Sequence, residues 1–88
     1  MTINHKERLF KALTNANRRS ILRQLRDHDP QTVKQLCSIT GCTFSVTAMH
    51  AKQLSAADLL ARDNSEWAAS YSLNPNMRPW VRQLLDRL

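Results

Sequence analysis

The only glycine of the chain, Gly41, lies between two segments that each begin with a threonine and have the residue spacing of a helix. Thr32 precedes the first segment, and Thr43 precedes the second, which continues to about Ala56. Threonine is a favourable helix N-cap, and a glycine supplies the sharp turn that joins two helices at a tight angle. We therefore expect a helix-turn-helix over about residues 32–56.

Two more helices are expected before this motif, because apolar residues recur there at helical spacing. The first covers about residues 4–13, and its apolar stripe consists of Leu9, Phe10 and Leu13. The second follows Asn15, a favourable N-cap, and its stripe consists of Ile21, Leu22 and Leu25. It ends near His28, because Pro30 cannot continue a helix.

A β-hairpin is expected over about residues 59–73. The apolar pair Leu59 and Leu60 precedes a polar turn, residues 63–66, and Tyr71 and Leu73 alternate after it as in a strand.

The segment of about residues 77–88 has the clearest amphipathic pattern of the chain. Pro79 suits the first turn of a helix, and Asn76 is expected to cap it. Its apolar stripe consists of Trp80, Val81, Leu84, Leu85 and Leu88. A helix this short is not stable alone in water, so the stripe must dock on another surface.

The order helix, helix, helix-turn-helix, hairpin, helix predicts a mainly α fold with a small β-hairpin wing, the winged helix-turn-helix. We expect residues 1–88 to form a single domain of this kind. Thirteen Lys and Arg against seven Asp and Glu give a net charge of +6, which favours a polyanionic partner, nucleic acid before an anionic membrane surface. No apolar run approaches the roughly 20 residues of a membrane span, and no export signal is visible, so a cytoplasmic protein with reduced thiols is expected.

Three segments carry a resemblance to a known family: LFKALTNANRRSILRQL (residues 9–25), LCSITGCTFSVTAMHAKQLSAADLL (36–60) and WAASYSLNP (67–75). In this order and spacing they resemble the ArsR-type family of bacterial and archaeal repressors. MarR-type regulators share much of the helix-turn-helix pattern and are the nearest alternative. The chain departs from the ArsR pattern at Asp58, where the family has Gly, and at the wing, where acidic Asp63 and Glu66 flank a turn without glycine.

The resemblance implies that the helix of residues 43–56 enters the major groove of double-stranded DNA. Its buried face would lie near Thr47, Ala51 and Leu54. Its outward residues would be Thr43, Ser45, Val46, Ala48, Met49 and Lys52. The alternative is a rotated helix with Val46 and Met49 in the core.

His50 is the one residue retained from the family's S-x-H-L stretch; it would bond a phosphate or cap a local network. Candidates for phosphate contacts are Arg18, Arg19, Lys34, Lys52 and Arg62, although one of the two adjacent arginines would instead brace the fold.

Metal, cofactor and catalytic functions are not indicated. The family's thiol site would place its ligands at Thr32 and Lys34, and its other site needs a His on the last helix, which has only Asp86. Cys37 and Cys42 are five positions apart, which is not a zinc spacing, and burial is favoured over redox or metal sensing for Cys42. No catalytic spacing links a nucleophile to a base, so an enzyme and a cofactor are not expected.

The stripe of the last helix has three open interpretations. It closes the protomer core, it pairs across a two-fold axis with Leu9, Phe10 and Leu13, as the family's first and last helices do, or it binds a different protein. The leading hypothesis is a homodimeric repressor that binds a palindromic promoter site. The alternative is a winged-helix protein-interaction module or co-regulator with little DNA readout.

Overall fold

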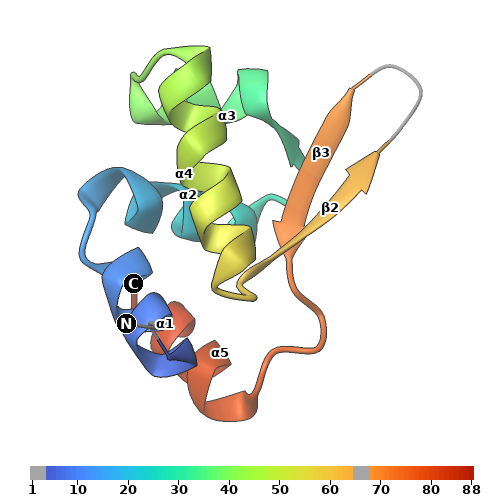
Figure 1. Ribbon diagram of the computed structural model, residues 1–88. Helices are drawn as coiled ribbons and strands as arrows, with labels where there is room; N and C mark the ends of the chain where they lie inside the picture. The colour runs from blue at the N-terminus through green and yellow to red at the C-terminus, as the bar shows by residue number, and fades with distance from the viewer. Residues whose placement is uncertain (1–3, 65–67) are drawn as a thin grey trace.

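The computed structural model describes residues 4–64 and 68–88 (Figure 1). Four of the five helices in this part of the chain begin after a polar residue whose side chain caps the helix. The elements are α1 (His5–Leu13), α2 (Ala16–Asp27), β1 (Gln31–Thr32), α3 (Val33–Thr40), α4 (Phe44–Ala56), β2 (Leu60–Asn64), β3 (Ala69–Leu73) and α5 (Pro79–Asp86). The winged helix-turn-helix predicted from the sequence is therefore confirmed.

The caps explain why the helices begin where they do. The side chain of Asn15 accepts hydrogen bonds from the backbone N–H groups of Asn17 and Arg18, and that of Thr43 accepts from Val46. At α3, Thr32 accepts from the backbone of Gln35, whose side chain accepts in return from the Thr32 N–H. This reciprocal capping box satisfies two N–H groups that a helix start leaves free.

The start of α5 differs from the prediction. Arg78 is its N-cap and makes no side-chain cap bond, and Pro79 is the first helical residue. Asn76 was expected to cap this helix, which is wrong. Its N–H donates to the side-chain oxygen of Asn74 at 3.0 Å, within the turn that precedes the helix. Proline suits the first position because it has no N–H to satisfy.

Two residues have left-handed backbones at helix ends. Gly41, at the end of α3, has φ of +71°, which allows the tight connection to α4. Asp58, one residue beyond the C-cap of α4, has φ of +60°. Asp58 therefore adopts the left-handed conformation that glycine adopts more easily. The helix α4 ends at Ala56 although no glycine follows it.

The hairpin of β2 and β3 pairs antiparallel from Leu60 with Leu73 to Asn64 with Ala69. Figure 1 shows it projecting from the helical body. The unpredicted β1 adds a third strand on the other side of β3. Residues 65–67, with Glu66 and part of the expected turn, lie outside the described residues.

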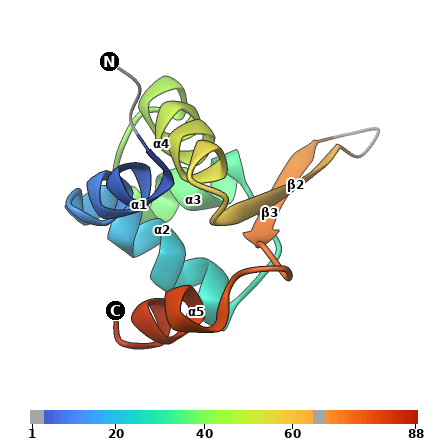
Figure 2. The ribbon, with the colours of Figure 1, turned by 60° about the horizontal axis from the view of Figure 1, so that its bottom comes forward.

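The core forms around α2, which contacts α1, α3, α4, α5 and β3. Figure 2 shows α1 and α5 on different sides of α2. The fully buried leucine and isoleucine side chains of the core are Leu9, Ile21, Leu22, Leu25, Leu36, Leu54, Leu59 and Leu85. Burying each contributes about 1.5–3 kcal/mol relative to exposure. In the described part of the chain, no helix has the length and apolar character needed to cross a membrane.

Candidate nucleic-acid interface

The orientation of α4 agrees with the face expected from the resemblance. Thr47, Ala51 and Leu54 are fully buried. Val46 is 39% exposed and Met49 is 46% exposed, so the rotated helix is wrong. A polar Thr47 is accommodated because its hydroxyl lies 3.4 Å from that of Thr40.

The outer face of α4 carries a mixture of polar and apolar side chains. Thr43, Ser45 and Lys52 are exposed with Val46 and Met49, while Ala48 is half-buried. The structure adds Phe44, which is 61% exposed at the first turn of the helix. Sequence analysis missed it, although its position four residues before Ala48 places both on one helical face.

A hollow of about 600 Å³ lies between α3, α4 and the hairpin. Three cations line it: Lys34 from α3, Lys52 from α4 and Arg62 from β2. Arg62 also lies over the Tyr71 ring, 6.0 Å from its centroid, a cation–π arrangement that holds the guanidinium against β3. The described residues lining this hollow include no carboxylate. It is therefore suited to a polyanion.

The two adjacent arginines of α2 both brace the fold. Arg18 is only 9% exposed and donates to the side-chain oxygen of Gln53 and to the Lys11 carbonyl, the latter at 3.1 Å. Arg19 donates to the Leu13 carbonyl at 2.9 Å. The prediction that Arg18 contacts a phosphate on the surface is corrected, because its guanidinium ties α2 to α1 and α4. Arg19 is half-buried and keeps part of its surface.

His50 lies inside the protein and not on the outer face of α4. It is buried, and its Nδ1 has no hydrogen-bond partner among the described atoms. Burial lowers the pKa of His50 from its ordinary value, and the positive charge of Arg18 lowers it further. A buried imidazole cannot reach a DNA phosphate, so the predicted contact is corrected.

The residues expected in a dimer interface divide into three groups by burial. Leu9, Val81 and Leu85 are buried within the protomer, which corrects their assignment to the interface. The half-buried members are Leu13, Leu84 and Leu88. Phe10 is 56% exposed, and Trp80 is also exposed; both line a hollow of about 360 Å³ with Lys6 and Arg78.

The two cysteines are free and half-buried. The side-chain amide of Asn17 donates to the sulfur of Cys42 at 3.2 Å. No group of three or more His, Cys, Asp or Glu residues could hold a metal ion within residues 4–64 and 68–88.

The capped helix-turn-helix, the exposed face of α4 and the adjacent hairpin define a winged helix-turn-helix protein. HlyU from Vibrio cholerae is 23% identical, with a TM-score of 0.80 over 94% of this chain and 86% of that one. The homodimeric winged helix-turn-helix DNA-binding domain of Mb0332 from Mycobacterium bovis, a possible ArsR-family transcriptional regulator, is 20% identical, with a TM-score of 0.79 over 94% and 73%. The transcriptional repressor PagR of Bacillus anthracis is 22% identical, with a TM-score of 0.76 over 94% and 91%.

No family model matches the sequence, and no curated protein matches it either. The similarity to these three solved structures is one of fold.

Proposed function

We propose that this protein is a sequence-specific DNA-binding transcriptional regulator that acts as a homodimeric repressor in the cytoplasm. One observation carries the proposal: the exposed face of α4 borders a hollow lined by Lys34, Lys52 and Arg62. DNA binding requires contacts to base edges and neutralisation of phosphates. The exposed helix can make the first, and the cations of the hollow can provide the second.

The side chains of α4 determine how bases are read. Thr43 and Ser45 offer hydroxyls to base edges or phosphates, while Val46, Ala48 and Met49 offer apolar contacts to thymine methyl groups. Phe44 joins this contact set because of its exposure. The helix has no arginine, so the bidentate contact to guanine is absent. A larger share of specificity then comes from backbone contacts and DNA shape.

Dimerisation through the exposed aromatic residues Phe10 and Trp80 completes the proposal. A two-fold dimer would place the two α4 helices roughly 34 Å apart, one turn of DNA. Such a dimer binds an inverted repeat, and occupation of a promoter repeat would block transcription.

Selection from a randomised duplex pool at near-physiological salt tests this function. We expect enrichment of an inverted repeat with half-sites about 10 bp apart. Lys52→Gln should lower the slope of log affinity against log salt by about 1, because one phosphate contact is lost. Arg23→Gln, which removes an exposed charge of α2, is the matched control and should leave the slope unchanged. Retention of every duplex without enrichment would contradict sequence-specific binding.

The apolar part of the same face supports a second candidate, a protein-interaction module. Phe44, Val46 and Met49 are large apolar side chains exposed on one helix. If this face binds a protein, the duplex selection yields no repeat, and Met49→Glu abolishes capture of that protein without changing DNA retention.

A further inference from the structure

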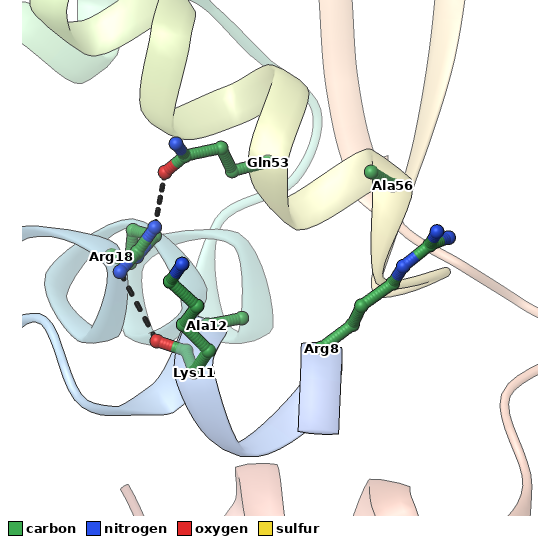
Figure 3. A pocket seen from close by; sticks show the side chains of 6 residues that line it. All are labelled: Arg8, Lys11, Ala12, Arg18, Gln53 and Ala56. Atoms are coloured by element: carbon green, nitrogen blue, oxygen red, sulfur yellow. Dashed lines mark hydrogen bonds between the residues drawn. The ribbon is translucent and has the colours of Figure 1, made fainter. Parts of the chain in front are cut away.

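A second cation-lined hollow lies where α1, α2 and α4 meet (Figure 3). Its volume is about 360 Å³, and its lining residues are Arg8, Lys11, Ala12, Arg18, Gln53 and Ala56. We call it the α1–α4 pocket. Its volume falls at the lower end of the range of small-molecule sites, about 300–1,000 Å³.

The helices place three positive side chains around this pocket. Arg8 and Lys11 are three positions apart on α1, so they project from the same face on consecutive turns. Arg18 enters from α2, and Figure 3 shows its guanidinium between Gln53 of α4 and the Lys11 carbonyl of α1. In the same view, Arg8 extends toward Ala56, near the end of α4. No described lining residue is acidic.

The buried member of this cluster lacks a counter-charge. Arg18 is 91% buried, given its exposed fraction of 9%. Its hydrogen-bond acceptors, an amide oxygen and a carbonyl oxygen, are both neutral. None of Arg8, Lys11 and Arg18 forms an ion pair with a described carboxylate. Buried charges in proteins are normally paired, because removing a lone ion from water costs free energy.

The guanidinium also retains unused donors. It has five N–H donors, and the described bonds use one N–H from each of its two terminal nitrogens. Its Nε is buried and has no hydrogen-bond partner among the described atoms. Lys11 and Arg8 add exposed donors around the mouth of the pocket.

We propose that the α1–α4 pocket is a binding site for a small organic or inorganic anion, recognised through a carboxylate or phosphate group. Arg18 supplies the buried positive charge, and Arg8 and Lys11 close on the anion from α1. Where the anion is organic, Ala12 and Ala56 contact its carbon skeleton. Charge-assisted hydrogen bonds from guanidinium and ammonium groups suit both kinds of anion. The ligand would link α1 to the C-terminal end of α4. Binding of this anion does not require DNA.

Amide chemical shifts of the full chain, followed by NMR at constant ionic strength, test the site. The two probes are inorganic phosphate and succinate, which distinguish a phosphate ligand from a carboxylate ligand, with chloride as the reference anion. We expect saturable shifts, with a Kd of about 1 mM or tighter for one probe, confined to amides around Lys11, Arg18, Gln53 and Ala56. Saturation by phosphate alone or by succinate alone would support the site and assign its ligand class.

Paired variants separate the pocket from general charge. Arg8→Gln with Lys11→Gln should weaken binding at least about tenfold, because charged hydrogen bonds contribute more than neutral ones. Arg23→Gln with Arg87→Gln removes the same net charge from exposed positions outside this pocket and should change the Kd less than about twofold. Arg18 is left in place because it braces the fold.

Three results would overturn the proposal. The first is the absence of saturable shifts with both probes. The second is equal weakening in the two double variants, which would indicate non-specific attraction. The third is a response of these amides to duplex DNA but to neither small anion, which would assign the cluster to the DNA backbone.

Discussion

The left-handed backbone of Asp58 is a single-residue feature with a measurable cost. Its φ of +60° disfavours any side chain with a Cβ, and the neighbouring His5 imidazole, 3.6 Å away at the surface, compensates little. We predict that Asp58→Gly raises the free energy of unfolding by about 1 kcal/mol. Chemical denaturation measures the change.

Asp58→Ala is the matched control, since it removes the same carboxylate but retains a Cβ. Alanine lacks the local hydrogen bonding that helps aspartate adopt this conformation, so Asp58→Ala should not stabilise the protein. Equal stabilisation by Gly and Ala would show that loss of the charge, not relief of the backbone, is responsible.

His50 should make the stability depend on pH. Its folded pKa lies below the ordinary value of 6.5, because burial and the Arg18 charge disfavour the imidazolium. The unfolded chain therefore binds more protons just below that pH, and stability must fall as the pH decreases through about 6.5. Unfolding midpoints between about pH 5 and 8 should slope less in His50→Gln than in the parent. An unchanged slope in His50→Gln would contradict this role of His50.

At the scale of elements, the N-caps set where the helix-turn-helix begins. The capping box of Thr32 and Gln35 satisfies N–H groups at the start of α3. Thr32→Ala should lower the free energy of unfolding by about 1 kcal/mol, and Thr43→Ala, at the start of α4, by a similar amount. Ser45→Ala, at the exposed second residue of α4, should change it by less than about 0.5 kcal/mol. Thermal and chemical unfolding compare the three variants, and an equal loss in Ser45→Ala would contradict the capping argument.

The same elements show what the sequence can and cannot predict. Asn15, Thr32 and Thr43 were recognised as caps because a cap bonds to residues only two or three positions away. The strand β1 was missed because it has two residues, and only its pairing with the distant β3 makes it a strand.

Side-chain placement at the candidate site follows the same rule. The buried face of α4 was predicted from family spacing and is confirmed in the structure. Sequence analysis left open whether Arg18 or Arg19 braces the fold and whether His50 caps a local network, because the burial of these side chains depends on how α1, α2 and α4 pack together. A basic residue on a predicted helix is expected to face water, and only the acceptors on neighbouring helices reveal that Arg18 does not.

For the whole molecule, positive charge gathers on two separate surfaces beside α4. The hollow near the wing contains Lys34, Lys52 and Arg62, while the α1–α4 pocket contains Arg8, Lys11 and Arg18. The basic residues behind the net charge of +6 are therefore divided between at least two surfaces. A polyanion fits the first hollow, and a small anion fits the second. Both surfaces include residues of α4.

Two exposed phenylalanines allow dimerisation and DNA binding to be separated. Phe10 on α1 lies beside Trp80, whereas Phe44 on α4 lines the hollow near the wing. Both are more than half exposed, at 56% and 61%, so neither is needed for the protomer core. We predict that Phe10→Glu converts a dimer to a folded monomer, because a charge cannot be buried unpaired at an apolar interface. Light scattering and circular dichroism measure mass and folding.

Phe44→Glu should remain dimeric but lose DNA affinity, since it places a negative charge beside the phosphates. Phe10→Glu should bind an inverted repeat more weakly while retaining its contacts to a single half-site, because only the linkage between two half-sites is lost. A parent protein that is monomeric at micromolar concentration, or a Phe10→Glu variant that remains dimeric, would exclude this surface as the interface. Loss of the dimer in Phe44→Glu would instead place the wing side of α4, and not α1, between the two protomers.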